Sequence, residues 1–252
     1  MSRGIKYVLY GFLFLFVLSF IIAAVYLLFF KAKINCEDGI LNQGEEKVDC
    51  GGPCIACEIK DFELIKSKVE IISISETKST LVATITNVNR NYGATGVNYS
   101  LSLINLVGDR LNLIEGETAL PPETTRYIIE PGLSINSLDI SRIEFEVEKS
   151  PSLLSKEDWV RHEVTIKQAK PVFSEGTMKI EGIVANSTGN DINTLKLSAL
   201  VRDSQGRLVS AAITVVDKLL AFKGKGFVIF VPISSNISAD ELETEILWEA
   251  VS

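Results

Sequence analysis

The sequence predicts a membrane-anchored, mostly β-stranded protein with a small cysteine-rich module after the anchor. Residues 7–30 contain no charged side chain, all cysteines lie in a short stretch directly after them, and apolar and polar residues alternate from Glu58 onward. Such patterns are typical of a membrane-spanning helix, a crosslinked module and half-buried strands, respectively. The segments that we expect are a cytoplasmic stub at 1–6, a transmembrane helix at 7–30, the cysteine-rich module at 34–57, and β-sandwiches at 58–150 and 159–252.

The apolar stretch at 7–30 is long enough to cross a bilayer. At about 1.5 Å of rise per residue, its 24 residues exceed the roughly 30 Å of hydrocarbon in a membrane. A cleaved signal peptide is the competing interpretation, because Arg3 and Lys6 resemble a basic leader. Signal peptides have apolar cores of about 7 to 15 residues, however. We therefore predict an uncleaved signal anchor that contacts membrane lipid.

The cysteines decide the predicted orientation of the chain. Arg3 and Lys6 precede the apolar stretch and Lys31 and Lys33 follow it, so the distribution of positive charge decides little. An even, clustered set of cysteines beside the membrane indicates disulfides, and hence an oxidising outer compartment. We expect a single-pass protein of the cell membrane, with its N-terminus inside and its C-terminal part outside.

The net charge of the chain disfavours two classes of partner. The formal net charge is −7. Without the two basic residues of the stub, 25 − 2 = 23 basic side chains face 32 acidic ones, which gives −9. Such a surface does not attract nucleic acid or anionic lipid. We expect an unidentified protein or glycan as partner, and no nucleic acid.

The module from Cys36 to Cys57 contains too few apolar residues to build a core, so crosslinks must hold it together. It resembles a short motif of extracellular proteins, C-x-D-G-x-x-N-x-G-E-x-x-x-D-C-G-G-x-C-x-x-C. The matching residues are Cys36, Asp38, Gly39, Asn42, Gly44, Glu45, Asp49, Cys50, Gly51, Gly52, Cys54 and Cys57. The resemblance implies a modular extracellular protein and names no activity.

The cysteine spacing leaves the chemistry of the module open. Four cysteines allow three disulfide pairings, and the sequence does not choose between them. One interpretation is a disulfide module without metal. A second adds Ca²⁺, because carboxylate and amide oxygens suit that ion; its candidate ligands are Asp38, Asn42, Glu45 and Asp49. A third is a zinc site that uses the close pair Cys54 and Cys57.

The remaining residues alternate with a period of two, as antiparallel strands with one buried face do. Ile143, Phe145 and Val147 alternate with glutamates, for example. The order of features then repeats, since Asn87, Gly108 and Pro131 match Asn186, Gly206 and Pro232 at offsets of 99, 98 and 101 residues. We predict two immunoglobulin-like or fibronectin-like β-sandwiches; a single closed barrel is the alternative.

The second half also resembles a family of prokaryotic surface domains. Residues 199–209 run through a strand and a turn in the manner of FxLYD-type β-sandwich domains. Arg202 stands where that family has Tyr, and Ala199 where it has Phe. This resemblance supports the sandwich prediction and implies nothing about activity.

No residue pattern specifies a reaction. His162 is the only histidine and is interpreted as an ordinary surface residue, and Trp159 as packed at the junction of the two sandwiches. No phosphate-binding loop or nucleophile motif is present in the sequence. Three glycosylation sequons are present, at Asn98, Asn186 and Asn236.

These observations favour a non-catalytic prokaryotic cell-surface protein with a binding or structural ectodomain, active in adhesion or envelope assembly. The prokaryotic origin rests on small size and on the resemblance of the cysteine module, whose motif recurs in bacterial, archaeal and animal extracellular proteins. An accessory subunit of a membrane protein complex is the first alternative. An enzyme with unrecognised chemistry is the second, and a deep polar pocket with perturbed acids would favour it.

Overall fold

The computed structural model describes residues 3–29, 34–66, 69–148, 151–174, 176–234, 237 and 242–251. The chain divides into two compact units, Met1–Asp61 and Phe62–Ser252. The predicted fold class is confirmed. The protein is mostly β, with one apolar N-terminal helix, two disulfides in a small cysteine region and antiparallel sheets.

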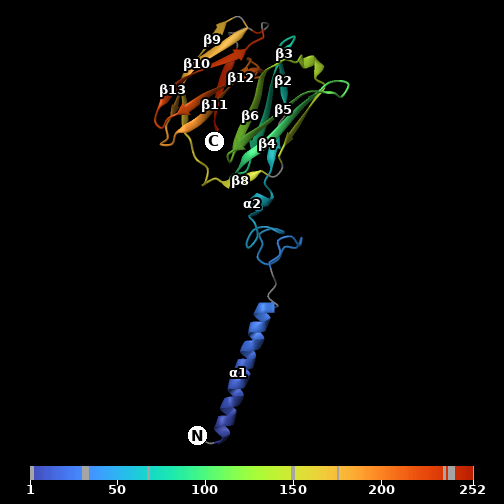
Figure 1. Ribbon diagram of the computed structural model, residues 1–252, viewed down its shortest axis with the longest axis vertical. Coiled ribbons are helices and arrows are strands. Elements are labelled where there is room, and N and C mark those ends of the chain that lie inside the picture. Colours follow the sequence, from blue (N-terminus) through green and yellow to red (C-terminus); the bar gives the residue numbers. More distant parts are fainter. Residues whose placement is uncertain are drawn as a thin grey trace. The chain divides into compact units, whose positions relative to one another are not determined.

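The first unit begins with helix α1 (Arg3–Phe29), drawn in blue in Figure 1. Its stretch Gly4–Tyr26 has a mean hydropathy of 2.7 and is long and apolar enough to cross a membrane. The helix starts inside the predicted stub 1–6, because Arg3 and Lys6 are good helix formers and backbone hydrogen bonding does not stop where polarity changes. Phe30 lies outside the described residues. Length and composition fit both a signal anchor and a signal peptide, so retention of the helix remains a prediction.

The second unit contains four antiparallel sheets in the described part of the chain. Sheet I consists of β1 (Leu64–Lys66), β2 (Glu70–Ser75), β3 (Lys78–Asn87) and β6 (Thr124–Leu133). Sheet II consists of β4 (Tyr92–Ile104), β5 (Arg110–Leu120), β7 (Arg142–Val147) and β8 (Ser152–Ser155). Sheet III consists of β9 (Val164–Ser174), β10 (Thr177–Asn186) and β13 (Gly224–Pro232), and sheet IV of β11 (Ile192–Arg202), β12 (Leu208–Leu219) and β14 (Glu243–Val251). A short 3₁₀ helix, η1 (Ser137–Asp139), lies between β6 and β7.

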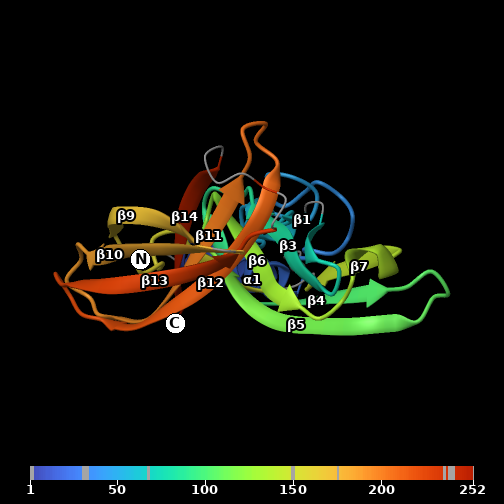
Figure 2. The same ribbon diagram turned by 90° about the horizontal axis from the view of Figure 1, so that it is seen from above.

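These sheets stack in four layers, in the order II, I, IV, III. Sheets I and II enclose one apolar core, and sheets III and IV enclose another. A third cluster joins sheet I to sheet IV, and its buried members are Ile72, Val82, Ile129, Leu200 and Ala211. Figure 2 shows the green strands of the first sandwich beside the orange and red strands of the second. The two sandwiches therefore form one packed unit.

The two halves repeat the same local hydrogen bonds at almost constant offsets. Nδ2 of buried Asn87 donates to the carbonyls of residues 92, 120 and 121, and Nδ2 of buried Asn186 donates to those of residues 190, 219 and 220. Each asparagine holds the end of its strand to the loop after the next hairpin. The hairpin turns match as well, since Asn105 Oδ1 and Asp203 Oδ1 each accept two backbone N–H groups.

Strand β8 lies in the gap that was expected between the sandwiches. It pairs with Tyr92–Thr95 of β4 and so belongs to sheet II. Its Leu153 packs against the core of the first sandwich. Burial of this side chain, in a stretch also containing serines and Pro151, explains why the segment is a strand rather than a free linker.

Candidate functional site

Two places in the described chain bring together the residues that the sequence singles out: the cysteine-rich module and a cleft in the second unit. The module is held by disulfides between Cys36 and Cys54 and between Cys50 and Cys57, one of the three pairings that the sequence left open. All four sulfurs are thus oxidised. A zinc site needs thiolate ligands, so the zinc alternative is wrong.

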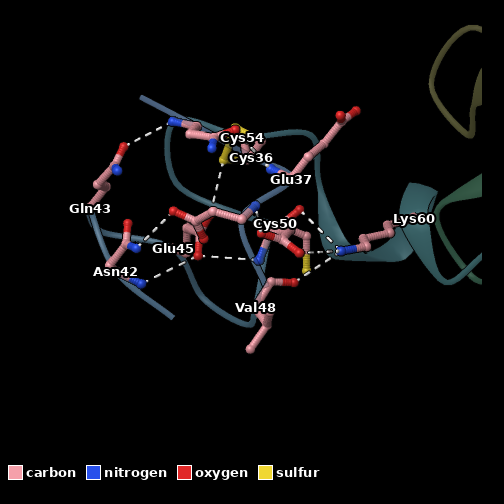
Figure 3. Close-up of a disulfide and its surroundings, with 12 residues drawn as sticks. Cys36, Glu37, Asn42, Gln43, Glu45, Val48, Cys50, Cys54 and Lys60 are labelled. Atoms are coloured by element: carbon pink, nitrogen blue, oxygen red, sulfur yellow. Dashed lines mark hydrogen bonds and ion pairs between the residues drawn. A yellow bond between two sulfur atoms is a disulfide. The ribbon is translucent and has the colours of Figure 1, made fainter. Parts of the chain in front are cut away.

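The four candidate calcium ligands do lie together in the module. Asp49 Oδ1 accepts the backbone N–H groups of Asp38 and Gly39 at 2.9 and 3.0 Å. Glu45 Oε2 accepts those of Asn42 and Asp49 at 3.4 and 3.2 Å. Figure 3 shows Glu45 with Asn42 to one side and Lys60 to the other. These carboxylates therefore hold the turns of a segment that has no apolar core.

Calcium binding stays a prediction, and the hydrogen bonds of the candidate ligands show what an ion would have to displace. Asp38 Oδ2 accepts Asn42 Nδ2 at 3.1 Å, and Lys60 Nζ lies 3.6 Å from Asp49 Oδ2. Asn42 Oδ1 is buried and has no hydrogen-bond partner among the described residues. An ion would have to displace amide and ammonium donors from the carboxylates, so binding must be accompanied by rearrangement of these turns.

The sequons differ in their accessibility. Asn98 is exposed on β4, and its Nδ2 donates to Glu148 Oε2 at 3.0 Å. Asn186 is only 3% exposed, and its Nδ2, the atom that a glycan would modify, donates to three carbonyl groups. The folded chain does not offer Asn186 for glycosylation, because modification would break the strand-end bonds. Asn236 lies outside the described residues.

The cleft has a volume of about 870 Å³ and lies where the two sandwiches meet. Three stretches of the chain form most of it: the start of β6 with the turn before it, the segment between β8 and β9, and residues 246–250 of β14; Ala119 of β5 and Ser198 of β11 complete it. The lining residues are Ala119, Pro121, Pro122, Thr124, Thr125, Arg126, Tyr127, Lys156, Trp159, Val160, Arg161, His162, Glu163, Ser198, Ile246, Leu247, Trp248, Glu249 and Ala250. A space of this size is typical of ligand-binding pockets.

An ion pair connects the two sandwiches at the floor of this cleft. Arg126 Nε on β6 lies 3.5 Å from Glu249 Oε1 on β14, and the two side chains are only 16% and 15% exposed. Thr118 Oγ1 donates to the same carboxylate oxygen at 3.0 Å. Arg126 also donates to the carbonyls of Ala119 and Trp248. Burial lowers the pKa of Arg126, and the charge of Glu249 acts in the opposite direction.

The segment between β8 and β9 is fixed to the first sandwich by Trp159. Its Nε1 donates to the carbonyl of Leu154 at 3.2 Å, and its ring lies on the backbone of Gly93. A Cβ atom at residue 93 would lie 2.4 Å from Trp159 Nε1, so only glycine fits there. His162 follows on the wall of the cleft. It is half-buried, and its Nδ1 is buried without a hydrogen-bond partner among the described residues.

Sequence reasoning placed Trp159 at the junction but did not find the cleft. No sequence motif includes Arg126, Trp248 or Glu249, because only the stacking of sheets I and IV brings these residues together. The cleft offers apolar side chains, an ion pair between Arg126 and Glu249, and a histidine nitrogen able to accept or donate one hydrogen bond. No protein-family model and no curated protein matches this chain.

Proposed function

We propose that this protein is a single-pass prokaryotic cell-surface protein whose non-catalytic ectodomain binds a partner in the cleft between its two sandwiches. The observation that carries the proposal is the cleft itself, built on a buried interface and a paired Arg126 and Glu249. A site held by two packed sheets is rigid before binding, so little free energy is spent on ordering it.

The membrane location rests on two supports. Helix α1 has the length and composition of a membrane span, and the two disulfides of the module are typical of an oxidising compartment. We infer an uncleaved anchor with the N-terminus inside and the second unit outside. The prokaryotic assignment rests on the resemblance of residues 36–57 to a motif of extracellular proteins.

Site-specific photocrosslinking in the membranes of the source organism tests this function. A photoreactive amino acid at Val160, on the rim of the cleft, should form a crosslinked product of constant mass. The same group at Leu106, which is 84% exposed at the tip of the β4–β5 hairpin, should not form it. Equal yields at both positions, or no product from Val160, would refute the proposal. A product from α1 alone would favour an accessory subunit of a membrane complex.

A further inference from the structure

The cleft runs along the edge of strand β14. Five consecutive residues, 246–250, line it. A strand that turns one face to a space contributes every second residue, because successive side chains point to opposite sides. Lining by consecutive residues therefore means that the edge of the strand, with its backbone groups, faces the cleft. On its other side β14 pairs with β11, and it has no second partner strand among the described residues.

The backbone groups at this edge can be assigned from one contact. The carbonyl of Trp248 accepts a hydrogen bond from Arg126, which belongs to the neighbouring sheet, so it points away from β11. In an antiparallel ladder the N–H and C=O of one residue point to the same side, and the side alternates along the strand. Ile246, Trp248 and Ala250 therefore direct their N–H and C=O groups to the cleft, where the carbonyl of Trp248 is already bonded to Arg126.

The edge of β14 differs from the corresponding edge in the first sandwich. Strand β7 is six residues long and carries exposed Glu144 and Glu146 at alternate positions, a usual protection against unwanted pairing. Strand β14 is nine residues long, and its residues 246–250 are half-buried. Their single charged side chain, Glu249, is neutralised by Arg126. Residues 246–250 of β14, which line the cleft, therefore lack the exposed charged side chains that protect the edge of β7.

We propose that the cleft accepts an extended peptide segment of a partner protein, which adds to β14 as a further antiparallel or parallel strand. This inference rests on the proposed function and names its ligand class. Main-chain hydrogen bonds would provide affinity, and alternate side chains would contact the two sides of the cleft. At about 3.3 Å per residue, a segment of roughly five to seven residues covers the edge.

The charges and packing around the edge narrow the chemistry of this peptide. Among the cleft residues three are basic and two are acidic, in a chain whose net charge is −7. A neutral or mildly acidic peptide is therefore the best electrostatic fit. Trp248 and Ile246 pack against the core of the second sandwich, and Leu247 packs in the joint between the sandwiches. Apolar side chains at alternate peptide positions would extend both clusters.

A peptide library provides the probe. The full-length chain in lipid nanodiscs is panned against displayed random nonapeptides, with empty nanodiscs as background. Ala250→Pro removes one N–H that faces the cleft and no ladder hydrogen bond, as proline on an edge strand requires. Ala250→Ser is the matched control, because it keeps that N–H. Melting curves of both variants establish that they are folded.

Strand addition predicts that selected peptides bind the parent and Ala250→Ser equally and bind Ala250→Pro at least about tenfold more weakly. Methylation of alternate backbone nitrogens of the peptide should weaken its binding to the parent chain by the same factor. This measurement tests strand addition even if Ala250→Pro does not fold. Amides of Ile246, Trp248 and Ala250 should exchange more slowly in the complex. No enriched peptide, or peptides insensitive to both changes, would overturn the inference.

The two proposals fail separately. A crosslink from Val160 that is unchanged by Ala250→Pro would keep the cleft as the binding site and refute strand addition. Peptides that bind along β14, without a crosslink from Val160 in the source membranes, would keep strand addition and refute the proposed function.

Discussion

The packing of sheet I on sheet IV can be tested by one substitution at its centre. Leu200 on β11 is fully buried and belongs to the apolar cluster with Val82 and Ile129 of the first sandwich. Leu200→Ala removes apolar contacts and leaves a cavity that two rigid sheets cannot close. Substitutions of this kind cost 2–5 kcal/mol, so we expect a loss of about 3 kcal/mol in the free energy of unfolding. For a unit of this size, that lowers Tm by about 6–12 °C.

Thermal unfolding of the full chain in detergent, followed by circular dichroism, measures the effect. Leu106→Ala is the control, because this leucine is 84% exposed and its loss should change the free energy of unfolding by less than about 0.5 kcal/mol. A Tm of Leu200→Ala within about 2 °C of the parent would correspond to a loss of less than about 1 kcal/mol. Leu200 would then not be packed between the sheets, and the stacked arrangement would be wrong.

Amide exchange distinguishes a shared unit from two independent sandwiches. The cavity left by Leu200→Ala would lie beside β11 of the second sandwich and border on β3 of the first, because Leu200 packs with Val82. In one cooperative unit the exchange of β3 amides should accelerate together with that of β11 amides. Acceleration confined to the second sandwich would show that the joint contributes little to stability and that the cleft is not rigid.

Four further substitutions probe polar groups of the same unit. Arg126→Met leaves Glu249 buried without its cation, so we expect a loss of about 2–4 kcal/mol in urea unfolding, and a near-parental stability would refute the buried ion pair. Asn87→Leu and Asn186→Leu each remove three hydrogen bonds to carbonyls; both should lower stability by about 2–4 kcal/mol, and a large difference between them would contradict equivalent roles. Burial raises the pKa of Glu130, and the charge of Lys196 partly offsets this effect. The pKa of Glu130 is therefore higher in the folded than in the unfolded chain. The contribution of protonated Glu130 to stability is fully present below the unfolded-state pKa and is lost as the pH rises through the folded-state pKa. Glu130→Gln should therefore melt above the parent at pH 7 and close to it at pH 4, and a constant difference would refute this.

The apolar helix and the disulfides could be predicted because each depends on local composition. A long uncharged apolar stretch is visible without knowledge of the fold, and cysteines in a segment with no core must be crosslinked. Strands with one buried face were also predictable. In β7, the residues Ile143 and Phe145 are half-buried while Glu144 and Glu146 are exposed, as the alternation predicts.

The stacking of the sandwiches was missed because its strands do not alternate. In β3, Leu81, Val82 and Ala83 are consecutive and all buried, with Leu81 and Ala83 facing sheet II and Val82 facing sheet IV. This short apolar run was the available signal, since strands covered on both faces read as continuous apolar segments. The cleft was beyond sequence reasoning, because its walls come from stretches that only the stacking brings together.

The internal repeat places different side chains at equivalent positions of the joint and of the outer faces. Sheet III corresponds to sheet I, and sheet II to sheet IV, so the outer faces of the unit are the counterparts of the two faces in the joint. Val82 of the joint corresponds to Glu181 on β10, which forms an ion pair with Lys179. Leu247 of the joint corresponds to exposed Glu146. Charged side chains at these positions would lose solvation in a further joint. The outer face of sheet III nevertheless also carries exposed Val228 and Phe230, and Val228 corresponds to Ile129 of the joint, so the charged pair lies beside apolar side chains there.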